Sequence, residues 1–175
     1  ELPMLTSLDV SNFNTGNVTT MQSMFNSVEK ITTLNIAGFN TTNVNNMSFM
    51  FANLYALTSL DFSSFFVTSS VTGMHYMFAG SSSLESLNLV HFDTSQVETM
   101  NSMFNGLSSL TSLDVSSFNT SKVKNMASMF EGLSQITYLN LSHFETYFTL
   151  NMEYIFKGMT NLNSLSVFCV IGITS

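Results

Sequence analysis

Charged residues, cysteines and long apolar runs are all scarce in this chain. Only 9% of its 175 residues are charged, and four lysines, no arginine and eleven acidic residues give a net charge of −7. Nucleic-acid binding requires clustered basic side chains, so we expect no nucleic-acid partner. The single cysteine, Cys169, excludes an internal disulfide and a cysteine-rich zinc module. The longest apolar run, residues 167–171, is far shorter than the roughly 20 residues of a membrane span.

What the chain does contain is a repeat of 26 residues, with one spacing of 27. The dipeptide Met-Phe returns once per repeat, and Ile155-Phe156 is its last copy. A leucine ladder and a phenylalanine ladder have the same period, and the one extra residue falls between Phe65 and Val71. The ladders are Leu8, Leu34, Leu60, Leu87, Leu113, Leu139 and Leu165, and Phe13, Phe39, Phe65, Phe92, Phe118 and Phe144.

Each repeat has two halves that differ in hydrophobic period. Leu8 and Val10 alternate with polar residues, which is typical of a half-buried strand. The apolar residues between 18 and 28 instead follow helical spacing and fall within about 80° of a helical wheel. Thr15 precedes this segment, where its hydroxyl could cap a helix. One repeat therefore predicts a strand followed by a short helix.

Such units cannot bury their apolar faces alone, so they must stack on one another. Strands stack at about 4.8 Å whereas helices need about 10 Å, so the stack must curve with its strands inside. We therefore predict an α/β fold: a parallel solenoid with strands on the concave side and short helices on the convex side. Residues 1–175 would form one repeat domain of about six repeats and a final strand.

These repeats resemble a known family. The pattern Leu-x-x-Leu-x-Val/Leu resembles the leucine-rich repeat, with Phe13 and its copies in the place of the usual asparagine. The segments LTSLDVSNFNTGNVTTMQSMFNSV and LTSLDVSSFNTSKVKNMASMFEGL are similar to the BspA-like leucine-rich repeats of bacterial surface proteins and mycoplasma lipoproteins. The resemblance implies an extracellular or cell-surface location and a role in adhesion, and it transfers no site residue.

A row of acidic and amide residues is expected on the solvent side of the strands. Because adjacent rungs lie about 4.8 Å apart, alternating Asp with Asn avoids like-charge repulsion. We interpret this concave polar ladder as structural; a weak calcium row is the alternative, because hard cations bind carboxylate and amide oxygens. The row is Asp9, Asn35, Asp61, Asn88, Asp114 and Asn140, and its seventh position is Ser166.

No catalytic or metal-binding motif is present in the sequence. The three histidines are scattered, and His91 and His143 lie two repeats apart, roughly 10 Å by strand spacing. No nucleophile elbow, zinc-protease motif or glycine-rich phosphate loop occurs. We therefore expect no enzyme, no cofactor and no metal.

The residues that break the repeat on exposed positions are the candidate protein-contact residues. Phe49 and Tyr76 replace serine on neighbouring helices and should point outward together, with Phe66 in the nearby loop. On or near the strand face, Tyr138, His143 and Phe168 also depart from the repeat. The alternative is that these side chains fill gaps left by local irregularity.

We predict a non-enzymatic surface adhesin or protein-binding module, whose partner would be a host extracellular-matrix or cell-surface protein. A stalk or self-associating spacer that presents another domain is the alternative. Leu2 already occupies a late-repeat position, so we expect a piece of a larger surface protein, with signal and anchor elsewhere. At the C-terminal end, either Ile171 and Ile173 fold over the last core layer or chains associate end to end.

Overall fold

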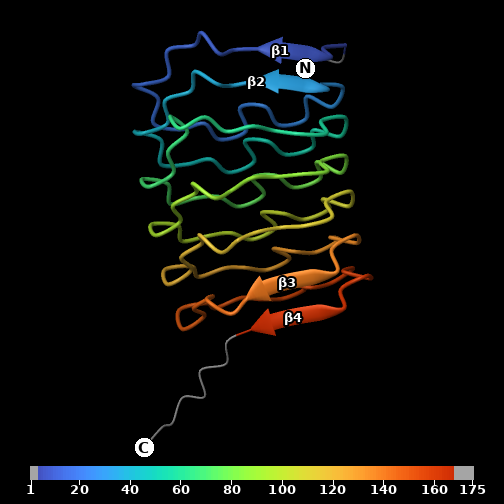
Figure 1. Cartoon of the computed structure of the whole chain (residues 1–175). Helices are drawn as coiled ribbons and strands as arrows, with labels where there is room; N and C mark the ends of the chain where they lie inside the picture. The colour runs from blue at the N-terminus through green and yellow to red at the C-terminus, as the bar shows by residue number, and fades with distance from the viewer. Residues whose placement is uncertain (1–3, 168–175) are drawn as a thin grey trace, which may run out of the picture.

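The computed structural model describes residues 4–167, and these form a stack of coils with one repeat in each coil (Figure 1). The elements are β1 (Ser7–Asp9), β2 (Thr33–Asn35), β3 (Tyr138–Leu141) and β4 (Ser164–Val167). β1 pairs with β2 and β3 pairs with β4, both in parallel. The pairs Leu8–Leu34 and Leu139–Leu165 are each one repeat apart. The predicted parallel solenoid with a 26-residue period is therefore confirmed.

The predicted helices are wrong, because residues 4–167 contain none. Where a helix was expected, the chain makes consecutive four-residue turns. The N–H of Met24 donates to the carbonyl of Met21 at 3.2 Å, and the N–H of Val28 donates to that of Phe25 at 3.3 Å. Turns of this length also bring apolar residues back every three or four positions. The helical spacing of the sequence therefore does not distinguish them from a helix.

Backbone bonds between coils are the reason why a helix does not form. In the first coil the N–H groups of residues 21, 23, 25 and 27 donate to carbonyls of the next coil at 2.9–3.0 Å. A helix would use these same N–H groups inside its own segment. The third residue of each turn has a positive φ, 58° at Ser23 and 61° at Ser27, as in a type II turn.

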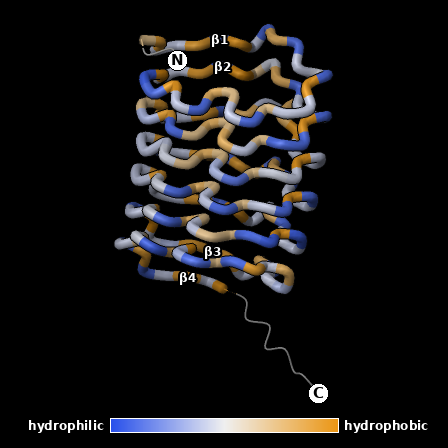
Figure 2. The backbone as a smooth tube through the Cα atoms, turned by 180° about the vertical axis from the view of Figure 1, so that it is seen from behind, coloured by the Kyte–Doolittle hydropathy of each residue, from blue (hydrophilic) through white to orange (hydrophobic). Residues whose placement is uncertain are grey.

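The predicted concave and convex sides are also wrong. Parallel bridges join the coils on the turn side as strand pairing does on the strand side, so both sides have strand-like spacing. Figure 1 accordingly shows coils in a nearly straight stack, without an outer layer of helices. Figure 2 shows polar and apolar positions recurring from coil to coil. The bridged positions are Thr20, Asn46, Gly73, Thr99, Asn125 and Asn151.

Two columns of phenylalanine rings run through the core. In the first column, on the turn side, neighbouring rings are nearly parallel, with centroids 5.7–6.2 Å apart. The second column packs against the first at 6.1–6.5 Å. We number the coils one to six by the first column, which is Phe25, Phe51, Phe78, Phe104, Phe130 and Phe156. The second column is Phe39, Phe66, Phe92, Phe118 and Phe144.

The second column corrects the predicted phenylalanine ladder at its third position. Phe66 is 3% exposed and Phe65 is 63% exposed, so Phe66 occupies the core. The Phe66 N–H donates to the Ser63 carbonyl at 3.0 Å, as the Phe39 N–H donates to Ile36 at 2.9 Å. The extra residue therefore precedes Phe66, and the prediction that Phe66 points outward is wrong.

A buried threonine joins each coil to the next, in place of the predicted helix cap. The Thr94 hydroxyl donates to the Asn119 carbonyl at 2.9 Å and accepts from the Asn119 N–H at 2.8 Å. Thr120 makes the same pair of bonds with Glu145. One side chain thereby satisfies both backbone groups of a residue in the following coil. The other members of this column are Thr15, Thr41 and Thr68.

Replacing Phe66 by Ala should lower the free energy of unfolding by about 3–5 kcal/mol, the usual cost of deleting a core aromatic. Phe65→Ala should cost less than about 1 kcal/mol, because that side chain lies mostly in solvent. Urea unfolding of both variants measures the difference. Equal losses of unfolding free energy in the two variants would contradict the assignment of Phe66, rather than Phe65, to the core.

Replacing Thr94 by Val should cost about 1–3 kcal/mol, because it leaves the N–H and carbonyl of Asn119 without their hydroxyl partner. Thr146→Val is the matched control, since Thr146 holds the same repeat position but is exposed. Thermal unfolding should show a clear loss for Thr94→Val alone. A loss of the same size in both variants would show that the hydrogen bonds between Thr94 and Asn119 do not stabilise the fold.

Candidate protein-contact surface

The concave polar ladder is exposed along its whole length, as predicted, although the face that carries it is not concave. Five of its six members accept a hydrogen bond from the N–H two residues later, and Asp61 is the exception. Asp9 accepts from Ser11 at 2.9 Å, and Asn140 accepts from Ser142 at 3.0 Å. The other bonds of this kind are made by Asn35, Asn88 and Asp114. Both carboxylate and amide oxygens can accept this bond, which is why Asp and Asn interchange.

These bonds also set the acidity of the ladder. Hydrogen bonds from the Ser116 hydroxyl and N–H hold the pKa of Asp114 below its ordinary value, and those from Ser11 do the same for Asp9. Within residues 4–167, no three His, Cys, Asp or Glu side chains come together as a metal site would require. The five hydrogen-bonded members have a structural partner, and this observation favours the structural interpretation of the ladder.

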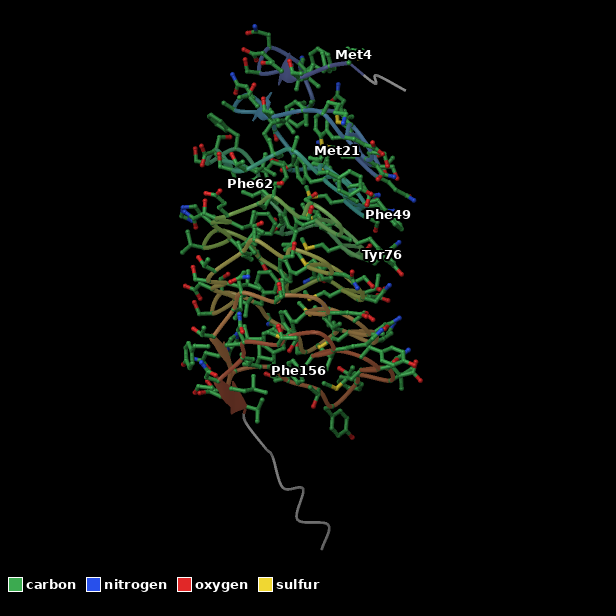
Figure 3. The ribbon with its side chains drawn as sticks, turned by 90° about the vertical axis from the view of Figure 1, so that its right-hand side faces the viewer. Met4, Met21, Phe49, Phe62, Tyr76 and Phe156 are labelled. Atoms are coloured by element: carbon green, nitrogen blue, oxygen red, sulfur yellow. The ribbon has the colours of Figure 1, made fainter. Side chains whose placement is uncertain are left out.

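Phe49 and Tyr76 lie side by side on the turn side of coils two and three (Figure 3), and both side chains are half-buried. Their rings are stacked, with centroids 4.7 Å apart and an interplanar angle of 3°. His75 meets both rings edge-on, at 5.3 and 6.1 Å. Its Nδ1 lies 2.9 Å from the hydroxyl of buried Ser48, and burial lowers the pKa of His75. This hydrogen bond fixes the orientation of the His75 ring.

The backbone at this aromatic pair is unfavourable for large side chains. Phe49 and Tyr76 have φ of 59° and 56°, at the third turn position that favours glycine. Ser102 and Ser128 occupy the same position at 55°. The fold requires a positive φ at this position in each coil, but it does not require an aromatic residue. We call Phe49, His75 and Tyr76 the turn-side aromatic cluster.

The other predicted contact residues do not join this cluster. Tyr138 is 52% exposed on β3, at the strand side. His143 is half-buried, and its Nε2 lies 2.8 Å from the Val115 carbonyl, so this nitrogen carries a proton. Phe66 is in the core, and Phe168 and the predicted C-terminal tail lie outside the described residues. Of the five predicted residues that the structure describes, only Phe49 and Tyr76 lie together.

The sequence reasoning missed two features of the exposed surface. His75 was treated only as a possible ligand, although its place beside Tyr76 in a turn would have signalled the cluster. In coil six, Tyr147, Phe148 and Leu150 are exposed where other coils have polar residues. Their departure from the repeat is visible in the sequence, where the preceding repeat has Ser121, Lys122 and Lys124.

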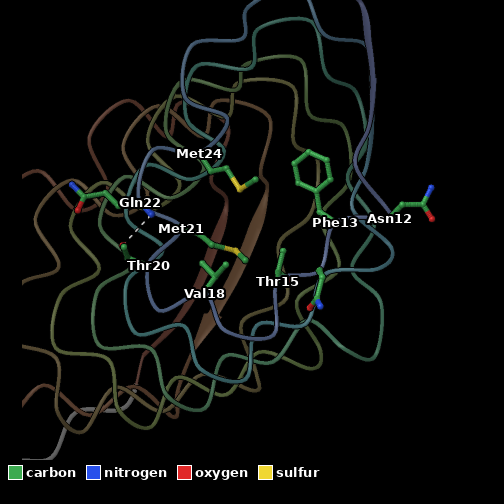
Figure 4. Close-up of a pocket in the computed structure, with 9 residues that line it drawn as sticks. Asn12, Phe13, Thr15, Val18, Thr20, Met21, Gln22 and Met24 are labelled. Atoms are coloured by element: carbon green, nitrogen blue, oxygen red, sulfur yellow. Dashed lines mark hydrogen bonds between the residues drawn. The ribbon is translucent and has the colours of Figure 1, made fainter.

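A hollow of about 600 Å³ opens at coil one (Figure 4). Phe13, Val18, Met21 and Met24 line it, and their copies in later coils are core residues. Phe13 is 55% exposed whereas Phe39 is fully buried. The hollow is therefore the uncovered face of the first described core layer, and it carries no group that would select a ligand.

A family model described as "Mycoplasma protein of unknown function, DUF285" matches residues 4–86 and again 59–167. The chain belongs to this family. No curated protein and no solved structure matches it. In the described part of the chain, no helix is long and apolar enough to cross a membrane.

Acidification should weaken the fold through the ladder carboxylates. Because the folded pKa of Asp114 lies below its ordinary value, its contribution to stability is present above pH 4 and is lost as the pH falls through the folded pKa. Asp114→Asn keeps the acceptor at every pH, so its urea midpoint should fall less than that of the parent between pH 7 and pH 3. Identical falls in both proteins would contradict this role.

Proposed function

We propose that this chain is a non-enzymatic protein-binding module of a bacterial surface protein of the BspA-like leucine-rich-repeat type, and that it acts in adhesion. The resemblance of its repeats to that group supports the location and the role. The family assignment agrees with a mycoplasma-type repeat protein. The partner would be a host extracellular-matrix or cell-surface protein.

The turn-side aromatic cluster carries the proposal for the binding surface. Aromatic residues are enriched in the energetic centres of protein interfaces, where rigid rings lose little entropy on binding. Phe49 and Tyr76 are stacked on each other and held by His75, so the surface is preorganised. Both rings occupy a backbone position that disfavours them, and a contact with a partner would account for aromatic residues there.

A stalk is the second candidate, and a different observation favours it. The coils are nearly identical, the stack is straight, and most of its surface is Ser, Thr and Asn. Such a structure would hold another domain away from the cell without contacting a partner along its length. The two proposals differ in whether the turn-side aromatic cluster is needed for binding.

The test is a pull-down of matrix and cell-surface proteins with the parent chain and with Phe49→Ser/Tyr76→Ser, which installs the residue found at Ser102. This variant should keep its stability within about 1 kcal/mol, because it loses one aromatic pair and retains a residue tolerated at that turn. It should lose at least tenfold in affinity for the captured protein. Phe65→Ser is the control, because it removes an exposed aromatic from another surface. Equal capture by all three proteins would favour the stalk.

A further inference from the structure

Coil six carries a lateral apolar surface that its sister coils lack. Tyr147, Phe148, Leu150 and Tyr154 are 89%, 59%, 87% and 62% exposed. We call these four residues the coil-six patch. In coil five the same positions are Ser121, Lys122, Lys124 and Ser128.

For Phe148 and Leu150 the exposure does not depend on the place of coil six in the stack, whereas the copies of Tyr154 inside the stack, Tyr76 and Ser128, are half-buried. Lys122 and Lys124 are exposed although coil five has a neighbour on each side. Side chains at these positions therefore point sideways, away from the stacking direction. Phe148 and Leu150 keep this direction, whereas Met152 holds a core position and is left out of the patch.

The size of the patch is that of an interaction surface. With about 200 Å² for each large side chain, the exposed fractions of 89%, 59%, 87% and 62% amount to about 600 Å². This is the upper end for the largest apolar patch of a monomer, and about three quarters of one side of a standard interface. Tyr147 and Phe148 pack edge-to-face at 4.8 Å, so part of the patch is already ordered.

The lysines at the edge of the coil-six patch, and the acidic residues paired with them, indicate which partner the patch can bind. Lys122, Lys124 and Lys157 are three of the four lysines in a chain of net charge −7. Lys124 pairs with Glu98 at 2.7 Å, and Lys157 pairs with Glu131 at 2.8 Å. Lys122 donates to the neutral Gln96 at 2.6 Å.

These lysines reach the patch itself. Lys122 and Lys124 line a shallow hollow of about 240 Å³ together with Phe148, and the Lys157 ammonium lies 5.0 Å from the centre of the Tyr154 ring. With Glu98, Glu131, Glu145 and Glu153 nearby, these lysines leave the local charge close to neutral, whereas the rest of the chain carries most of the net negative charge. Two copies of this chain repel each other elsewhere and can approach at this edge.

We propose that the coil-six patch is a self-association surface, and that its occupant is the coil-six patch of a second copy. The ion-paired rim presents both signs of charge, so it is complementary to itself across a two-fold axis. Apolar rings at the centre and paired charges at the edge are the usual arrangement of a small specific interface. This surface lies on a different coil from the turn-side aromatic cluster, so a dimer leaves that cluster free.

Sedimentation velocity of the whole chain should show a dimer that forms as the concentration rises from about 5 to 500 μM, as fits a small interface. The triple variant Tyr147→Ser/Phe148→Lys/Leu150→Lys copies coil five and should stay monomeric with unchanged thermal unfolding. It also places two lysines per copy at the contact itself, so an uncharged variant is needed to separate the loss of apolar contact from local like-charge repulsion. Leu150→Thr is a milder variant, which installs the residue found at the same repeat position in Thr19 and Thr72. It should weaken the dimer at least fivefold.

Two controls separate this surface from others. Phe65→Lys removes an exposed aromatic from another coil, and Phe13→Ser alters the open end at coil one; both should dimerise like the parent. A parent that stays monomeric to 500 μM overturns the proposal. So does a dimer that survives the triple variant, or one that is lost in Phe13→Ser. Binding of the parent to neutral lipid vesicles without dimer formation would assign the patch to a membrane instead.

Discussion

The hydrogen bonds between successive coils are the interaction on which the rest of this structure depends. On the turn side, every second N–H donates to the next coil, as Phe25 donates to Met50 at 3.0 Å. An N–H that leaves its own segment cannot close a helical turn, so the segment becomes a series of turns with positive φ at set positions. Both sides of the coil then rise by a similar amount, and the stack grows straight.

The core and the coil-to-coil bonds support each other. Because the coils are held at strand-like spacing, equivalent phenylalanines stack nearly parallel, and the Met side chains fill the space beside them. The buried Thr94 and its copies use one hydroxyl to satisfy two backbone groups of the next coil. Identical residues in register are therefore needed at few positions, and the others are free to vary. The turn-side aromatic cluster and the coil-six patch both occupy such free positions.

Much of the fold could be predicted from the sequence, because a repeat must place equivalent residues above one another. The period, the parallel pairing of Leu8 with Leu34, and the exposed row that includes Asp9 and Asn140 all followed from it. The secondary structure of residues 18–28 did not, since apolar spacing of three and four fits turns as well as helices. Glycine was the neglected signal: Gly80, Gly106 and Gly132 recur at the third turn position, with φ of 74–77°.

For the candidate site, the sequence identified Phe49 and Tyr76 as neighbours because they replace the same serine in adjacent repeats. It could not place Phe65 and Phe66 correctly, because either ring fits the ladder when one residue is inserted. A backbone hydrogen bond distinguishes them, because the Phe66 N–H donates to the Ser63 carbonyl as the core phenylalanine of each other coil donates to the residue three positions earlier. His75 adjoins Tyr76 in the sequence, but its contacts with Ser48 and with both rings come from the structure.

The insertion near Ser63 shows that coil circumference and axial register are independent in this architecture. Coil three has one residue more than its neighbours, yet Phe51 and Phe78 stack at 5.7 Å, as Phe25 and Phe51 do. The added length is taken up at the corner near Ser63, where Phe65 projects into solvent. This corner is therefore a natural grafting position. Longer loops could enter at it, one coil at a time, without altering the alignment of the coils above and below.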